Sequence, residues 1–436
     1  MRRLYNILFT VFLCLSAPYY FWKMWRRGNW RSGFTQRFGH YSARVKQSVT
    51  NRHTLWLHAV SVGEVNICTQ LIRTLELRAP NATIVVSTTT STGMAELERK
   101  LPSHVLKLYY PIDRRRWVQR AFAVVHPRAI VLVEAEIWPN FLWRAKGLKT
   151  PVFLVNARLS KRSYRGYKFL PGLFRPLFAS FAGVGCQNEE DAKKLISLGC
   201  KPEVVRVVGN LKYDAAKLDE RRATDVPELL RQIGAPPDAR LLVGGSTHRG
   251  EEGLLAEVFV RLRPRFPNLF LVIVPRHHER GREAGKDVAA QGVKFIYRKE
   301  VTPATQLKPG EVDCLLVNTT GELKCLYEYA SVVFIGKSLT AEGGQNPIEP
   351  AMMGKPIVLG PNMQNFEAIT NSLLAGKGAI QVADAAGLET AVASVLANAK
   401  LAEELGANAQ RVVRENLGSI ERTVDMILES LQEKNG

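Results

Sequence analysis

The first acidic residue of this 436-residue chain is Glu64. The 63 residues before it contain ten lysines and arginines but no aspartate or glutamate, and the whole chain carries a formal net charge of +20. Low-complexity tracts and internal repeats are also absent, and a composition with 46% hydrophobic and 23% charged residues is that of a globular protein. The excess of positive charge raises the expectation of a polyanionic partner: nucleic acid, an acidic membrane surface or a phosphorylated substrate.

Paired cysteines are lacking as well. No C-x-x-C motif occurs, and no histidine stands at the spacing of a metal site beside the six cysteines, Cys14, Cys68, Cys186, Cys200, Cys314 and Cys325. This pattern predicts buried, reduced thiols and agrees with a cytoplasmic location.

An apolar segment, residues 4–22, lies inside the basic arm. As a helix it would reach roughly 28 Å, about one hydrocarbon core. An aromatic belt would consist of Tyr19, Tyr20, Trp22 and Trp25, and the positive residues that follow keep everything downstream in the cytoplasm. No small-x-small cleavage site followed by a polar mature start is present, which argues against a signal peptide. A single-pass anchor and a monotopic helix lying flat, broken at Pro18, both remain open.

Short apolar runs alternate with helical patterns downstream, which is typical of parallel sheets with helices on both faces. The first series of predicted strands is 55–60, 83–87, 105–108, 129–133, 152–155, 183–186 and 204–208. The second is 241–244, 269–274, 294–297, 314–317, 332–335, 356–359 and 379–382. Two Rossmann-like lobes facing a cleft are expected. The predicted domains are an anchor and basic arm at 1–47, a first lobe at 48–214, a linker at 215–240, a second lobe at 241–415, and a C-terminal helix at 416–436 that packs back on the first lobe.

Ligands of open α/β sheets bind at the carboxyl ends of the strands. Polar residues follow several predicted strands, at 61–64, 134–140, 156–158, 245–252, 275–280 and 318–323. Segment 332–361 combines a strand, a loop with Gly343 and Gly344, a helix start capped by Asn346 with Pro347 at its first position, and a second strand. Such a loop offers backbone N–H groups to a phosphate and suggests a nucleotide-sugar donor site, although the glycine pair alone is equally typical of an ordinary βα turn.

These motifs together resemble those of the Kdo transferases, membrane-associated GT-B glycosyltransferases that move 3-deoxy-D-manno-octulosonic acid (Kdo) from CMP-Kdo onto the lipid A precursor. The resemblance covers nearly the whole chain. It is carried by S-V-G-E at 61–64, E-x-E-x-W-P-N at 134–140, N-A-R-L-S at 156–160, Q-N-E-E-D at 187–191, G-N-L-K-Y-D at 209–214, S-T-H-x-G-E-E at 246–252, V-P-R-H-x-E-R at 274–280, T-x-G-E-L at 319–323 and G-G-x-N-P-x-E at 343–349. Three residues depart from it: Asn210 where serine is also common, Gln345 where histidine is common, and Lys337 where glycine is frequent.

The resemblance implies a GT-B fold with an N-terminal membrane-anchor helix and an inverting transfer of Kdo to lipid IVA in lipopolysaccharide core biosynthesis. The enzyme would act at the cytoplasmic face of the inner membrane, with membrane lipid but no nucleic acid as a partner. No cofactor is expected. A single phosphate leaves with CMP, and no D-x-D motif flanks a suitable strand, so metal independence is predicted.

The resemblance also assigns roles to individual residues. Glu64 is expected to be the catalytic base. The expected donor-site residues are Pro275, Arg276, Thr319, Thr320, Gly321, Gly343, Gly344, Gln345, Asn346 and Glu349, and those expected at the acceptor site are Glu134, Glu136, Arg158 and Lys212. Several of these have an alternative structural role: Glu64 could serve only as a helix-dipole partner, and the arginines could be solvated surface charges.

Two other functions compete. Another GT-B transferase or an epimerase acting on a UDP-sugar would prefer UDP to CMP. A membrane-tethered module that binds polyanions would show salt-sensitive nucleic-acid binding, but that reading leaves the carboxylates after the strands unexplained.

Overall fold

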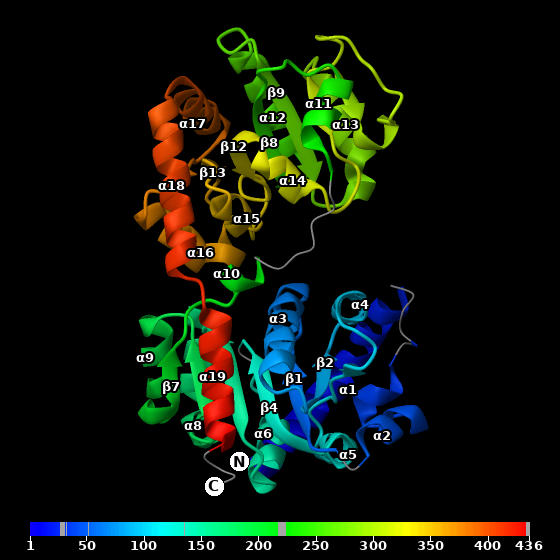
Figure 1. The fold of residues 1–436 in the computed structure, drawn as a ribbon. Coiled ribbons are helices and arrows are strands. Elements are labelled where there is room, and N and C mark those ends of the chain that lie inside the picture. The colour runs from blue at the N-terminus through cyan, green and yellow to red at the C-terminus, as the bar shows by residue number, and fades with distance from the viewer. Residues whose placement is uncertain (27–30, 32, 51, 135, 217–223, 433–436) are drawn as a thin grey trace. The chain divides into compact units, whose positions relative to one another are not determined.

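The computed structural model describes residues 1–436 except 27–30, 32, 51, 135, 217–223 and 433–436. The chain divides into two compact units (Figure 1). Unit 1 comprises Met1–Leu218 and Leu417–Gly436, and unit 2 comprises Asp219–Asn416. Each unit contains one parallel sheet of seven strands flanked by helices, so the prediction of two α/β lobes is confirmed.

The sheet of unit 1 has the strand order β3-β2-β1-β4-β5-β6-β7. Its strands are β1 (Thr54–His58), β2 (Thr83–Thr88), β3 (Leu106–Tyr109), β4 (Pro127–Val133), β5 (Val152–Ala157), β6 (Gly183–Cys186) and β7 (Val205–Val207). The order reverses between β1 and β4, which pair in parallel. Such a switch point leaves a crevice beyond the carboxyl ends of the two strands, where ligands of this class of sheet bind.

The sheet of unit 2 has the order β10-β11-β9-β8-β12-β13-β14. Its strands are β8 (Arg240–Thr247), β9 (Leu269–Pro275), β10 (Phe295–Tyr297), β11 (Cys314–Leu316), β12 (Ala330–Ile335), β13 (Ile357–Leu359) and β14 (Ile380–Gln381). Here the order reverses between β8 and β12. All fourteen strands therefore lie where the apolar runs predicted them, within three residues at either end.

Alternating side chains of the strands feed two cores on opposite faces of the first sheet. In β1, Trp56 belongs to one buried cluster, whereas Leu55 and Leu57 belong to another. Helices cover both faces because side chains of successive strand residues point in opposite directions. The helices of unit 1 are α1 (Arg2–Arg26), η1 (Thr35–Phe38), α2 (Ala43–Val49), α3 (Val62–Arg78), α4 (Ser91–Lys100), α5 (Arg115–Val125), α6 (Pro139–Gly147), α7 (Lys161–Phe169), α8 (Pro171–Phe178), α9 (Glu189–Ser197), η2 (Pro202–Val204), α10 (Lys212–Ala215) and α19 (Ser419–Gln432).

Helix α19 closes one face of the first sheet. Its side chains Ile420, Val424 and Ile427 lie in the same buried cluster as Leu55 and Leu57 of β1. Asp214 holds the start of this segment, because its carboxylate accepts hydrogen bonds from the backbone N–H groups of Gly418 and Ile420, each at 2.9 Å.

The helices of unit 2 are α11 (Val226–Gln232), α12 (Glu251–Leu262), η3 (His278–Arg280), α13 (Gly281–Ala290), η4 (Arg298–Glu300), α14 (Leu323–Glu328), α15 (Ile348–Met352), η5 (Gln364–Phe366), α16 (Glu367–Ala375), α17 (Ala385–Ala397) and α18 (Ala399–Glu415). The stretch 215–240, expected to be a linker, contains α11. Val226, Leu229 and Ile233 are buried, so this polar segment still contributes an apolar side to unit 2.

The apolar N-terminal segment forms one helix, and residues 2–23 are long and apolar enough to cross a membrane, as predicted. Two details differ from the expectations: α1 continues through Pro18, where the monotopic alternative placed a break, and Cys14, predicted to be buried, is exposed. The other five cysteines are buried as predicted.

Candidate active site

Glu64 lies in the first turn of α3, just beyond the carboxyl end of β1. The N-cap residue Ser61 accepts a hydrogen bond from the Glu64 N–H at 3.2 Å and donates its hydroxyl to Glu64 Oε1 at 2.7 Å. The backbone N–H of Val60 donates to Glu64 Oε2 at 2.8 Å. This reciprocal capping arrangement fixes the carboxylate at the helix start, beside the switch point of the first sheet.

The surroundings of Glu64 change its protonation. Burial, together with the nearby carboxylates of Glu134 and Glu136, raises the pKa of this carboxyl to about 7, although the hydrogen bonds from Val60 and Ser61 oppose the shift. A carboxylate whose pKa lies near neutral pH can take up a proton effectively under working conditions. The structural role as a helix cap and a role as a base are therefore compatible at this residue.

Glu134 and Glu136 follow β4, the other strand of the switch point. Glu134 adopts the left-handed conformation with φ +60°, which is unfavourable for a residue with a side chain and concentrates at functional sites. Glu136 accepts a hydrogen bond from Trp138 Nε1 at 2.7 Å. Burial raises the pKa of Glu136, and the charge of Glu134 adds to this rise. Three carboxylates thus gather on the two loops that flank the crevice.

Lys212 and Arg158 bring positive charge to the same loops. The Lys212 Nζ lies 3.9 Å from Glu134 Oε1. Burial lowers the pKa of Lys212, and Arg158 lowers it further, whereas Glu134 and Glu64 raise it. The five unit 1 residues expected at the catalytic and acceptor sites are therefore brought together, with cations beside carboxylates.

A chain of buried amides positions Lys212. Gln187 Nε2 donates to the Asn156 carbonyl, and Asn210 Nδ2 donates to Gln187 Oε1, each at 3.1 Å. Asn210 Oδ1 then accepts from the Lys212 N–H at 3.0 Å, while Asn156 Oδ1 accepts from the Leu211 N–H at 3.1 Å. No local sequence pattern predicts this role for the amides, although each lies in one of the motifs at 156–160, 187–191 and 209–214. Asn156 also has a positive φ of 52° at the end of β5.

The pKa of Glu64 predicts the pH dependence of turnover. A base must be deprotonated, so we expect kcat/KM to rise as pH increases through about 7 and to level off above it. Replacing Glu136 by glutamine removes a like charge, so the pKa of Glu64 falls and the midpoint of the profile moves to lower pH. A pH–rate profile of both proteins measures this shift. An unchanged midpoint in Glu136→Gln would show that the two carboxylates are not coupled.

In unit 2, a buried carboxylate organises the loop after β12. Glu251, the first residue of α12, is fully buried. Its Oε2 accepts from the N–H groups of His248 at 2.8 Å and Lys337 at 2.6 Å, and its Oε1 accepts from those of Ser338 at 2.9 Å and Leu339 at 3.1 Å. This one side chain therefore ties the loop after β8 to the loop after β12, across the switch point of the second sheet.

The glycine loop differs in part from its prediction. Helix α15 begins at Ile348 and has only five residues, with Pro347 as its N-cap instead of its first position. Asn346 Oδ1 still accepts from the Ile348 N–H at 3.1 Å. The Gly343 N–H donates to Gln364 Oε1 at 2.7 Å and the Gly344 N–H donates to the Lys337 carbonyl at 3.0 Å. These two N–H groups, expected to face a phosphate, are already occupied by the loop itself.

Glycine is nevertheless favoured at 344. Its φ is +67°, and a Cβ there would lie 2.4 Å from Met363 Sδ. Lys337, one of the three departures from the resemblance, has a φ of +57°. A left-handed conformation costs an L-residue roughly 1–2 kcal/mol, whereas glycine adopts it readily.

The other expected donor-site residues lie on neighbouring loops of unit 2. Pro275 ends β9, and the Arg276 N–H donates to the Thr247 carbonyl at 3.0 Å. The Arg276 side chain is exposed and forms no ion pair with any residue that the structure describes. After β11, the Thr319 hydroxyl donates to Glu322, and Gly321 has a φ of +89°. Beside the glycine loop, Asn346 Nδ2 donates to Glu349 Oε1 at 3.2 Å.

Arg280, four residues after Arg276, has a structural role. Its guanidinium lies 3.0 Å from the fully buried Glu252 and 3.2 Å from Glu283. Burial raises the pKa of Glu252, and Arg280 opposes that rise. The Arg280 guanidinium is thus held by two carboxylates of unit 2, whereas the Arg276 guanidinium is available to a ligand. Among the residues with described placement, no group of three histidine, cysteine, aspartate or glutamate side chains could hold a metal ion.

Comparisons with known proteins agree with the family resemblance of the motifs. A family model described as 3-deoxy-D-manno-octulosonic-acid transferase (Kdo transferase) matches residues 32–215. A 3-deoxy-D-manno-octulosonic acid transferase of Bordetella pertussis is 30% identical over 438 residues, which cover 96% of this chain and 98% of that protein. The protein of the same description from Haemophilus influenzae is 29% identical over 401 residues, 91% of each chain.

The fold also has solved counterparts. The crystal structure of a glycosyltransferase from Rickettsia africae superposes with a TM-score of 0.58, covering 88% of this chain and 98% of the other, at 12% sequence identity. At this identity the likeness concerns the fold, which is that of two-sheet GT-B proteins.

Proposed function

Because the chain belongs to the Kdo transferase family of glycosyltransferases, we propose that it transfers Kdo from CMP-Kdo to the lipid A precursor lipid IVA, with inversion, in lipopolysaccharide core biosynthesis. The observation that carries this proposal is the group of Glu64, Glu134 and Glu136 beside Lys212 and Arg158 at the switch point of the first sheet. A base close to additional carboxylates and cations suits an acceptor that offers both hydroxyl and phosphate groups.

In the proposed reaction Glu64 removes the proton from an acceptor hydroxyl. The oxygen attacks the anomeric carbon of Kdo from the face opposite CMP, and a new C–O bond forms. The bond from that carbon to the phosphate oxygen breaks, and CMP leaves with the electron pair. One displacement inverts the configuration of the anomeric carbon, and the proton ends on Glu64.

The donor is proposed to bind to unit 2. Arg276 suits the CMP phosphate, because a guanidinium can make two parallel hydrogen bonds to phosphate oxygens. The loops with Thr319, Thr320 and Gly321 and with Gln345, Asn346 and Glu349 would contact the rest of the nucleotide. Gly343 and Gly344 would shape the loop through their backbone conformations instead of donating to the phosphate. Fixed donors can stabilise a single departing phosphate without a metal ion.

Arg276 gives a direct test of the donor site. We expect Arg276→Ala to weaken CMP binding by about 2 kcal/mol, roughly 30-fold, because a charge-assisted hydrogen bond to phosphate is lost. Isothermal titration calorimetry with CMP measures the change. Arg249→Ala is the matched control, since Arg249 is an exposed arginine of the same unit paired with Glu283 at 2.7 Å. Equal CMP affinities of the two variants would contradict the assignment of Arg276, and activity abolished by EDTA and restored by Mg²⁺ would contradict metal independence.

The proposed location is the cytoplasmic face of the inner membrane, with α1 as the anchor. One apolar helix of this length, near the N-terminus, fits such attachment.

One assay tests the proposed function as a whole. The protein is incubated with CMP-Kdo and lipid IVA, and the products are weighed by mass spectrometry. Lipid IVA whose mass increases by one or more Kdo residues supports the proposal. No product from CMP-Kdo, together with tighter binding of UDP than of CMP, would support the alternative function on a UDP-sugar.

A further inference from the structure

Exposed apolar side chains are concentrated on α1. Among the residues that the structure describes, twelve of the twenty exposed large hydrophobic side chains lie within residues 1–25. Leu8, Val11, Phe12 and Leu15 are 53 to 78% exposed. Their spacing places them on one side of the helix, so α1 presents a continuous apolar stripe to its surroundings.

The opposite side of α1 is attached to unit 1. Tyr5 Oη donates to the buried Asp113 at 2.8 Å, Asn140 Nδ2 donates to Asn6 Oδ1 at 3.0 Å, and the Phe9 ring meets the Trp138 ring edge to face at 6.5 Å. Toward the other end of the helix, the Phe21 ring lies 6.3 Å from that of Phe34.

These contacts determine how α1 can meet a membrane. Tyr5 and Phe21 are separated by about 24 Å along the helix axis, close to the thickness of a hydrocarbon core. A helix crossing the bilayer would place one of these contacts on the far side or in the hydrocarbon. Both contacts belong to the same compact unit, so α1 keeps them only if it lies along the surface of unit 1.

A second basic and apolar feature lies at the corner between α7 and α8. Residues 137–188 contain nine lysines and arginines and no acidic residue. Five of these cations are exposed on α7 and α8, namely Lys161, Arg162, Arg165, Lys168 and Arg175. At the corner itself Phe169 is 83% exposed and Leu170 is 43% exposed. An apolar tip surrounded by cations is typical of a segment that enters the interface of an acidic bilayer.

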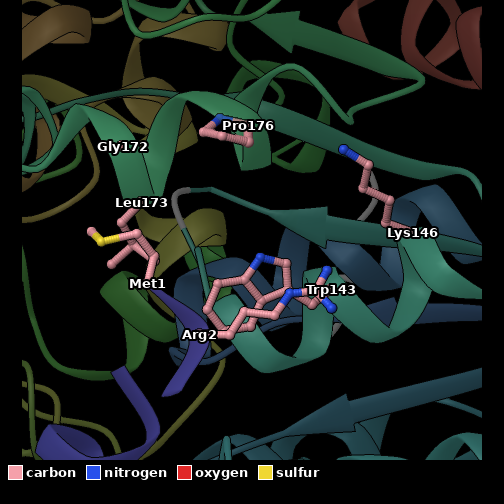
Figure 2. Close-up of a pocket in the computed structure, with 7 residues that line it drawn as sticks. All are labelled: Met1, Arg2, Trp143, Lys146, Gly172, Leu173 and Pro176. Carbon is pink, nitrogen blue, oxygen red and sulfur yellow. The ribbon is translucent and has the colours of Figure 1, made fainter. Parts of the chain in front are cut away.

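The corner adjoins the beginning of α1. A cavity of about 310 Å³ is lined by Met1 and Arg2 of the N-terminal segment, Trp143 and Lys146 of α6, and Gly172, Leu173 and Pro176 of α8 (Figure 2). The Arg2 guanidinium lies 5.0 Å from the centre of the Trp143 ring. The apolar stripe, the cavity and the corner are therefore neighbouring parts of one unit.

We propose that unit 1 binds an acidic lipid leaflet at two adjacent places, with α1 lying in the plane of the membrane and Phe169 and Leu170 inserting beside it. The exposed cations of α7 and α8 meet the anionic head groups. This inference rests on the membrane attachment proposed above and does not depend on the sugar transferred.

The test measures insertion depth in the full-length chain. Cys14, the exposed native cysteine, is first replaced by serine, and single cysteines are then introduced by Phe169→Cys or Leu77→Cys and labelled with an environment-sensitive fluorophore. Leu77 on α3 is the matched control, since it is also 83% exposed. Vesicles of phosphatidylcholine and phosphatidylglycerol carry a spin-label quencher near the head groups or deep in the acyl chains. We expect the shallow quencher to remove fluorescence at 169 and to leave it unchanged at 77.

The orientation of α1 is tested in the same way with Leu4→Cys, Leu15→Cys and Trp22→Cys. A helix in the membrane plane gives the same shallow depth at all three positions. A spanning helix would place Leu15 deep and the other two shallow, which would overturn the proposal for α1.

Other outcomes separate the possible occupants of the corner. Partition onto vesicles of phosphatidylcholine alone is expected to be at least about tenfold weaker than onto vesicles that contain phosphatidylglycerol, because the attraction to anionic head groups is lost. Equal partition would overturn the acidic-lipid part of the proposal. Equal fluorescence at 169 and 77 with lipid would overturn insertion of the corner, and a concentration-dependent shift at 169 without lipid would assign that surface to self-association. Transfer to detergent-dispersed lipid IVA, measured on the same preparations, reports separately on the proposed function.

Discussion

We expect Glu64→Gln to lower the turnover number by at least about 10²-fold, the scale on which a positioned general base contributes. Glutamine has nearly the same shape and can still accept a hydrogen bond from the Val60 N–H, so the first turn of α3 should remain intact. It cannot take up the proton of the acceptor hydroxyl at neutral pH. Steady-state kinetics with CMP-Kdo and lipid IVA, together with CMP titration, measure the two effects separately.

The control is Glu76→Gln on the same helix. Glu76 is only partly exposed and is paired with His104 at 2.7 Å, away from the start of α3. We expect this variant to retain turnover. If Glu64→Gln and Glu76→Gln have similar turnover numbers, Glu64 is not the base, whatever its pKa.

The second large effect is expected at Glu251. Glutamine at this position would turn an N–H₂ group toward backbone N–H groups that now share a fully buried carboxylate. Breaking such a buried charged network costs about 3 kcal/mol or more, which for a unit of this size lowers the unfolding midpoint by about 5–10 °C. Because the loop after β12 loses its main tether, CMP binding should weaken as well. Thermal unfolding and CMP titration of the folded variant measure both.

Glu283→Gln provides the comparison within unit 2. Glu283 is a surface partner of Arg249 and Arg280, so its replacement should change the unfolding midpoint little. A folded Glu251→Gln protein with unchanged CMP affinity would show that the glycine loop holds its shape without this carboxylate.

The sheets could be predicted from sequence because buried parallel strands are short apolar runs with polar residues at their carboxyl ends. Periodicity could not predict the start of α15. Pro347 is compatible both with the first helical position and with the position before it, and the choice depends on the contacts of Asn346 with Ile348 and Glu349. Similarly, the glycine pair predicted a loop after the strand, but not the partners of its N–H groups, because Gln364 lies after the next strand and Lys337 lies at the start of the same loop.

The residues of the candidate site were identified more completely than the groups that support them. Glu64 and Glu134 lie within six residues after a strand, and Lys212 lies in a sequence motif beyond β7, so the motifs point to all three. Gln187 and Asn210 act through side-chain contacts between segments 23 residues apart, which no local pattern reveals. The stretch 137–188 contains no acidic residue, as is also true of residues 1–63, so composition alone could have indicated a second basic surface.

The return of α19 to the first sheet has a consequence for synthesis of the protein. Unit 2 is built from one continuous stretch of chain. Unit 1 needs both the segment that precedes unit 2 in the sequence and the last helix, which follows it. On a ribosome, unit 2 can therefore complete its fold first, while the face of the first sheet that Ile420, Val424 and Ile427 will cover waits without its helix. The earlier-made part of the protein is the later to finish, and during that interval its uncovered apolar face is a place where a chaperone would bind.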